Sequence, residues 1–184
     1  MVERQEFPIW CNGQHRLKMS FMLLYLVRHA IAEDRAPGGA DDPERRLTDK
    51  GIRKMRAHVR ALGSLSVELD AIWTSPYRRA AQTAEILSEL HGFDGEVYVE
   101  DRLAPGGDIR GLQRALSAID PDSALAFVGH EPDLGELFGM LLFSQGTSIC
   151  RFKKGAVASI DYNPSDGFAQ LHWLLTPRQM RMMV

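Results

Sequence analysis

The sequence is poor in cysteine and has no long apolar run. Only two cysteines, Cys11 and Cys150, occur among the 184 residues, and they form no C-x-x-C pair. We interpret them as reduced thiols of a cytosolic protein, while a disulfide between them stays open. No stretch approaches the roughly 20 apolar residues that cross a bilayer. We therefore expect a soluble, cytoplasmic protein.

The sequence also lacks an excess of charge of one sign. Its 22 Lys and Arg residues nearly balance 24 Asp and Glu residues, which gives a formal net charge of -2. This balance provides no general attraction for nucleic acid or for an acidic membrane, so we expect neither as a partner. Paired metal ligands at short spacing, such as H-x-x-x-H, are absent, so we expect no metal and no other cofactor. Nothing in the sequence indicates an oligomeric state.

The chain length fits one domain with a complete hydrophobic core. Residues 1–20 mix charged, apolar and turn-forming residues without a period, so we expect an amino-terminal extension there, outside a domain that spans residues 21–184. Short apolar runs predict strands, at residues 21–27, 71–73, 97–99 and 125–128. Helical spacing of apolar residues predicts helices, over residues 48–62, 77–90, 108–119 and 132–142.

The carboxyl-terminal part of the sequence has a different pattern. Two apolar segments, 156–162 and 168–175, flank a turn-forming segment, which predicts two antiparallel strands at a sheet edge. With the preceding alternation of strands and helices, this predicts a three-layer α/β/α domain with a mostly parallel, mixed sheet. We expect His58 to lie on the solvated face of the first helix, and Met180 to belong to a frayed tail.

Arg28 and His29 stand directly after the first predicted strand. A guanidinium and an imidazole that emerge together at a strand end can bind a phosphate group and attack it. The dipeptide alone is a weak signal, because short motifs often arise without function. A phosphate site at this strand end would therefore need further basic residues or histidines from elsewhere in the sequence.

Two other predicted strands end in similar residues. The segment Ser75-Pro76-Tyr77-Arg78-Arg79 follows the strand at 71–73, and His130 follows the strand at 125–128. In open α/β sheets, ligands bind outside the carboxyl ends of the strands, so we expect the three ends to meet in one crevice. The polar segment 32–46 leaves the first strand, and we expect this loop to shape the mouth of the crevice.

These motifs resemble the histidine phosphatase superfamily, also called the phosphoglycerate mutase-like group, and the chain length is most similar to its small SixA-type phosphohistidine phosphatases. The resemblance runs from about residue 22 to about residue 177. It depends on four segments in a fixed order: Leu26-Val27-Arg28-His29-Ala30, Leu47-Thr48 with Gly51, Thr74 to Ala80 with Thr83-Ala84, and Val128-Gly129-His130-Glu131-Pro132. The resemblance implies a phosphoglycerate mutase-like fold and a metal-independent phosphatase activity.

The family pattern implies that His29 is the nucleophile and that Arg28, Arg78 and His130 surround the phosphoryl group. Physical reasoning leads to the same types of residue, because phosphoryl transfer depends on positioning and on fixed cationic donors. The attacking ring must be neutral, so its other nitrogen should donate a proton to a carbonyl or a similar acceptor. We favour Arg78 over Arg79, taking the family arginine to stand two residues after Ser-Pro and Arg79 to be a solvated helix residue.

The general acid is less well defined. Phosphoglycerate mutase relatives have a glutamate before the second histidine motif, where this chain reads Arg102-Leu103-Ala104-Pro105-Gly106-Gly107. The acid phosphatase branch instead has a carboxylate directly after that histidine, and Glu131 occupies this position. Glu131 is equally well interpreted as a cap of the fourth helix, and Asp108 is a more distant candidate. Ala30 replaces the glycine that is commonest after the Arg-His pair, which we expect to reduce room at the phosphate without abolishing activity.

The first hypothesis is therefore a phosphatase that works through phosphorylated His29 and acts on protein phosphohistidine. A small phosphorylated metabolite is the alternative substrate. A phosphate-binding regulatory module that has lost turnover is the alternative from another class, and the retained residues Arg28, His29, Arg78 and His130 argue against it.

Overall fold

The computed structural model of the protein describes residues 21–34, 42–144, 146 and 148–184. The extension predicted for residues 1–20, which includes Cys11, lies outside the described residues. Half of the predicted 32–46 loop, residues 35–41, lies outside them as well.

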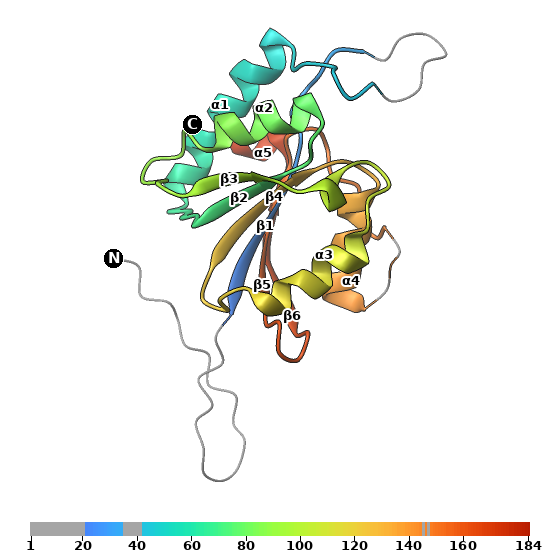
Figure 1. The fold of residues 1–184 in the computed structure, drawn as a ribbon. Coiled ribbons are helices and arrows are strands. Elements are labelled where there is room, and N and C mark those ends of the chain that lie inside the picture. The colour runs from blue at the N-terminus through green and yellow to red at the C-terminus, as the bar shows by residue number, and fades with distance from the viewer. Residues whose placement is uncertain (1–20, 35–41, 145, 147) are drawn as a thin grey trace.

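Six strands form one mixed sheet in the order β3-β2-β4-β1-β5-β6 (Figure 1). In chain order the strands are β1 (Met22–Arg28), β2 (Ala71–Thr74), β3 (Glu96–Val99), β4 (Ala124–Gly129), β5 (Val157–Tyr162) and β6 (Ala169–Leu175). The first four pair in parallel, whereas β5 and β6 are antiparallel. The predicted mostly parallel sheet with an antiparallel edge is confirmed.

Helices cover both faces of the sheet, as predicted for a three-layer domain (Figure 1). One face carries α1 (Asp49–Ser64), α2 (Arg78–Leu87) and α5 (Pro177–Met180), and the other carries α3 (Ile109–Ala115) and α4 (Asp133–Phe143). The third predicted helix is shorter than expected, because it continues as the 3₁₀ turn η2 (Leu116–Ala118); a second 3₁₀ turn, η1 (Asp101–Leu103), precedes it. Among the described residues, no helix has the length and apolarity needed to traverse a bilayer.

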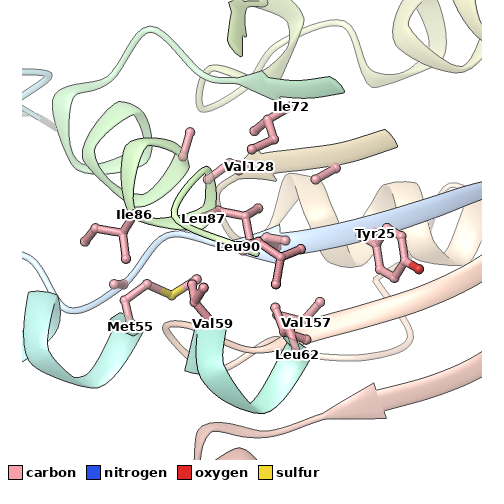
Figure 2. Close-up of a cluster of buried hydrophobic side chains, with 14 of the residues drawn as sticks. Tyr25, Met55, Val59, Leu62, Ile72, Ile86, Leu87, Leu90, Val128 and Val157 are labelled. Carbon is pink, nitrogen blue, oxygen red and sulfur yellow. The ribbon is translucent and has the colours of Figure 1, made fainter. Parts of the chain in front are cut away.

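Two hydrophobic cores fill the space between the sheet and its two helical layers. Along β1, Leu24 and Leu26 pack toward α3 and α4, while Tyr25 and Val27 pack toward α1 and α2. This alternation follows from the two-residue period of a strand. Figure 2 shows the core between the sheet and helices α1 and α2. Residues from α1, from α2 and the turn after it, and from four strands pack together there: Met55, Val59, Leu62, Ile86, Leu87, Leu90, Tyr25, Ile72, Val128 and Val157. Because both faces of β1 are buried, the strand is a continuous apolar run.

Two expectations about this face are wrong. His58 of α1 is only 2% exposed, and Met180 of α5 is completely buried. The cause is α5, which packs against α1 and covers the side of it that would otherwise be solvated. Thr176 begins α5 with a capping box, in which its side chain and that of Gln179 bond to each other's backbone. Such a cap allows a helix of one turn to form where the sequence indicated a tail.

The amino terminus of α1 is anchored to the segment that follows β1. The Thr48 N–H donates to the Ile31 carbonyl at 3.0 Å, and the Thr48 hydroxyl accepts from the Gly51 N–H at 3.0 Å. A β-carbon at position 51 would lie only 2.0 Å from the Ile31 carbonyl oxygen, so only glycine fits this approach. The Leu47-Thr48 and Gly51 motif therefore holds the residues immediately after His29.

Candidate active site

The carboxyl ends of β1, β2 and β4 meet at one edge of the sheet. The His29 N–H donates to the Gly129 carbonyl, and the Ser75 N–H donates to the Val128 carbonyl, both at 3.0 Å. The rings of His29 and His130 consequently lie 5.1 Å apart, centroid to centroid. The expectation that the three strand ends converge is confirmed.

His29 is held as a neutral imidazole. Its ring is 5% exposed, and Nδ1 lies 2.7 Å from the Ala30 carbonyl oxygen. A carbonyl can only accept, so Nδ1 carries the proton and Nε2 keeps the lone pair. Burial, chiefly, lowers the pKa of His29 to about 3, and the positive charges of Arg79, Arg28 and Lys154 add to this effect against the opposing Ala30 bond.

His130 is fixed by contacts from the strand end beside it. Its Nε2 lies 2.8 Å from the Ser75 hydroxyl, and the ring of Tyr77 packs edge-on against it at 5.3 Å between centroids. His130 is 2% exposed and Ser75 is completely buried, so both are shielded from bulk water. The position of the His130 ring is therefore set by Ser75 and Tyr77, two residues of the third motif segment.

Arg28 reaches from β1 to the loop before β5. Its Nη1 donates to the Phe152 carbonyl at 2.6 Å, whereas its Nε is buried and has no hydrogen-bond partner among the described residues. Burial lowers the pKa of Arg28, and the negative charge of Glu131 opposes that effect. The guanidinium stays charged, and one of its buried donors is left without an acceptor.

The structure reverses the choice between the two neighbouring arginines. Arg79 is 2% exposed, and its charge lowers the pKa of both His29 and Arg28. Its guanidinium stacks 4.8 Å from the Tyr77 ring centroid and donates to the Asp42 carbonyl at 3.2 Å. Arg78, in contrast, is 39% exposed at its side chain and forms a 3.5 Å ion pair with Glu44. The structure therefore brings Arg79 to His29 and does not bring Arg78.

Helix geometry explains the difference between positions 78 and 79. Successive residues on a helix point about 100° apart, so only one of the two arginines can face the sheet. Arg79 lies on the same stripe as Thr83 and Ile86, which are buried, while the stripe of Arg78 contains the exposed Glu85. This apolar periodicity was the signal in the sequence that favoured Arg79.

Thr83 connects this helix to the residues around His29. Its hydroxyl donates to the Arg79 carbonyl at 2.7 Å and accepts from the Ala30 N–H at 3.0 Å. Both bonds are buried, where a bond of this kind is costly to leave unmade. Thr83 therefore fixes α2 relative to Ala30, whose carbonyl in turn orients the His29 ring.

Lys154 is a basic residue near the site that the sequence motifs did not indicate. It stands before Gly155, whose N–H donates to both the Arg28 and the His29 carbonyls at 3.1 Å. Burial and the charge of Arg28 lower the pKa of Lys154, and Lys154 in turn helps to lower the pKa of His29. No local pattern in the sequence signals it, because only the pairing of β5 with β1 brings this loop to the site.

Glu131 lies next to the cationic residues but does not cap α4. Its Oε1 accepts from the Phe152 N–H at 2.7 Å, and α4 begins after Pro132 without a side-chain cap. Burial raises the pKa of Glu131, against the opposing effects of the Phe152 N–H and the Arg28 charge. A carboxyl group with a raised pKa is suited to donate a proton.

Asp108, the other carboxylate considered, has a structural role. Its side chain accepts from the Gly111 N–H at 2.8 Å and so caps α3. It is 60% exposed and also contacts Arg114 at 3.5 Å. The structure therefore gives Asp108 no contact with the residues around His29.

The site combines one neutral imidazole with several fixed cations. Arg28 and Arg79 lie around His29, with Lys154 at the edge, and their charge favours a bound dianion. In the part of the chain that the structure describes, no three His, Cys, Asp or Glu residues are grouped so as to hold a metal ion. The arrangement can bind a phosphoryl group and present a ring nitrogen to it.

Comparison with known proteins gives consistent matches. The profile of the Histidine phosphatase superfamily (branch 1) matches residues 24–141. An uncharacterized protein of Picosynechococcus sp. PCC 7002 is 37% identical over 142 residues, which cover 76% of this chain and 84% of that protein. Phosphohistidine phosphatase SixA of Escherichia coli K12 is 27% identical over 163 residues, 88% of this chain and 98% of that protein.

Solved structures show the same fold. A structure of the protein histidine phosphatase SixA complexed with tungstate superposes with a TM-score of 0.75 at 26% identity, covering 85% of this chain and 97% of that one. The alpha-ribazole phosphatase from Shigella flexneri superposes with a TM-score of 0.68 at 19% identity, covering 84% and 96%. The predicted phosphoglycerate mutase-like fold of the SixA type is confirmed.

The two arginines should differ sharply in mutants. We expect Arg79→Ala to lower kcat/KM for an aryl phosphate by about 100-fold or more, as loss of one transition-state donor does, and Arg78→Ala to lower it by less than about tenfold. Arg79→Lys, which keeps the charge, should recover part of the loss. Circular dichroism of each variant controls for folding, and equal losses in the two alanine variants would contradict the assignment.

The ring of His29 should stay neutral through the physiological range. With a folded-state pKa of about 3 and an unfolded value near 6.5, its NMR signals should not titrate between pH 5 and 8 in phosphate-free buffer, whereas they should in urea. Between those two values the unfolded chain binds more protons, so the free energy of unfolding should fall as the pH falls. His29→Asn should reduce that slope, and a His29 midpoint near pH 6.5 in the folded protein would disprove the prediction.

Proposed function

Because this chain belongs to the histidine phosphatase superfamily, we propose that it is a protein phosphohistidine phosphatase of the SixA type in which His29 accepts the phosphoryl group. That the chain is a phosphatase follows from the family match and from its similarity to SixA. The observation that carries the proposed mechanism is the His29 ring, which is buried among cations and keeps its Nε2 lone pair because Nδ1 bonds to Ala30.

In the first step, Nε2 of His29 attacks phosphorus and forms a P–N bond, while the bond from phosphorus to the leaving group breaks. Negative charge spreads over the three equatorial oxygens during this transfer. Arg28, Arg79 and His130 are the donors that stabilise it. The buried Nε–H of Arg28, which lacks an acceptor in the described chain, is suited to bond a phosphoryl oxygen.

In the second step, water attacks phosphorus and gives a proton to the Glu131 carboxylate left by the first step, while the P–N bond to His29 breaks; this releases inorganic phosphate and restores the neutral ring. The Ala30 carbonyl helps in both steps, because it stabilises the positive charge that the ring carries while it is phosphorylated. The residues perform both steps through positioning and charge, with no metal in the proposed chemistry.

Glu131 is the proposed proton donor to the leaving group. Its raised pKa favours the protonated carboxyl, and its bond to the Phe152 N–H holds it on the same peptide segment that binds Arg28. A nitrogen leaving group, such as the imidazole of phosphohistidine, is itself basic and needs less help than an alkoxide. A single, partly constrained acid therefore suits phosphohistidine better than alkyl phosphates.

Protein phosphohistidine is supported as the substrate by the similarity to SixA, which covers nearly all of both chains. The described connections between strands also include no inserted helical domain above the three strand ends. A site of this kind can admit a protein surface. A small phosphorylated metabolite is the alternative, since alpha-ribazole phosphatase shares the fold.

The direct test is hydrolysis by the chelator-treated protein. We expect activity on an aryl phosphate to survive chelation and to disappear in His29→Ala, and a phosphorylated intermediate to be trapped on His29. The kcat/KM for a phosphohistidine carrier protein should exceed that for small phosphate monoesters by at least about tenfold. Higher kcat/KM for a small monoester would refute the proposed substrate, and sensitivity to chelation would refute the metal-free mechanism.

Removal of the proton donor should depend on the leaving group. We expect Glu131→Gln, which can keep a side-chain acceptor for the Phe152 N–H, to slow hydrolysis of an alkyl phosphate by about 100-fold and that of an activated aryl phosphate much less. Glu136→Gln, which changes a half-buried carboxylate in the first turn of α4, is the control. Equal losses on the two substrates would remove Glu131 as the acid.

A further inference from the structure

A small pocket lies beside the active site, on the other side of the chain that follows His29. We call it the His58 pocket. It has a volume of about 40 Å³, and its lining includes Lys54 and His58 of α1, Ala30 and Lys154 next to the active site, and Arg181 after α5. This volume holds several water molecules or one small anionic group.

His58 is an unusual residue to find in the wall of this pocket. It is 2% exposed, and neither of its ring nitrogens has a hydrogen-bond partner of ordinary geometry among the described residues, although the Gly155 backbone lies beside Nδ1. A neutral imidazole always carries one N–H donor, and buried donors are nearly always paired. The Gly155 backbone bonds to the ring, and both nitrogens are buried, so His58 forms part of the pocket wall and its signals report on a group bound there.

The charges around His58 are all positive. Lys54, Lys154 and Arg181 line the pocket, and none of the three forms an ion pair within the described chain. Asp34 attracts Lys154 but only from beyond ion-pair distance. Burial, chiefly, lowers the pKa of His58 to about 4, and the charges of Arg181 and Lys54 contribute, against an opposing effect of the Gly155 backbone. Three cations that form no ion pair among the described residues favour a bound anion.

We propose that the His58 pocket binds an oxyanion, which is held beside the His58 ring by Lys54, Lys154 and Arg181. Phosphate, sulfate and carboxylate groups share the required chemistry. Two sources can supply such a group: a free inorganic anion, or a second anionic group on the substrate whose phosphoryl group lies at His29. Lys154 contacts both regions electrostatically, so an anion here would also act on the active site.

Binding is tested by NMR of the histidine ring signals while sodium sulfate is added to the full chain. We expect a saturable shift of the His58 signals and an increase of at least one unit in the pKa of His58. Sodium chloride at the same ionic strength separates binding from screening. The His29 signals in the same spectra report sulfate at the active site, so the two sites are distinguished without any turnover.

A double variant with a matched control tests which residues hold the anion. Lys54→Ala with Arg181→Ala should abolish the sulfate-dependent shift of His58. Lys50→Ala with Arg178→Ala, which removes the same charge from exposed positions of α1 and α5, should keep it. The proposal would be overturned if the His58 signals did not shift with sulfate, if they shifted equally with chloride, or if the sulfate shift were the same in both double variants.

The source of the anion is tested by kinetics, and only this arm depends on the proposed phosphatase activity at His29. If the substrate supplies the group, Lys54→Ala with Arg181→Ala should raise KM at least tenfold for an aryl phosphate that carries a carboxylate, and leave KM for plain phenyl phosphate unchanged. If this double variant changes KM equally for the two esters and still loses the sulfate-dependent shift of His58, the pocket is assigned to a free anion. Absence of turnover would contradict the proposed function and leave the binding result intact.

Discussion

The parallel pairing of β1 with β4, and of β4 with β2, is the constraint on which the rest of the site depends. Because parallel strands end at the same edge, the residues after each strand are brought together although they are far apart in the sequence. Arg28 lies opposite Gly129 in the register, so His29 and His130 follow on adjacent strands. A shift of one residue would turn every side chain of β1 to the other face and remove both the core and the site.

The site combines buried positive charge with a neutral imidazole. Cations near His29 favour a bound phosphoryl group, while burial, chiefly, and the same charges lower the pKa of His29 and leave a ring nitrogen with its lone pair. The guanidinium of Arg79 can be buried because the Tyr77 ring and the Asp42 carbonyl offset part of its desolvation. Once phosphate is bound, its charge replaces the solvent that these groups have lost.

One peptide segment links several parts of this arrangement. The Phe152 carbonyl accepts from Arg28 and its N–H donates to Glu131, while the Phe152 ring is buried against Phe138 of α4. Two residues later, Lys154 stands between the active site and the His58 pocket. The loop before β5 thus contributes residues to both the active site and the His58 pocket, although none of these residues belongs to a motif named from the sequence.

Local periodicity and chain connectivity were enough to predict the order of strands and helices other than α5, the mixed sheet and the meeting of three strand ends. The sequence by itself also identified Arg28, His29 and His130, which stand directly at strand ends. Long-range packing decided the rest: it buried His58 beneath α5 and brought Lys154, in the loop before β5, to the site. Both outcomes depend on contacts between segments more than 100 residues apart, since α5 covers α1 and β5 pairs with β1, and no local pattern encodes such packing.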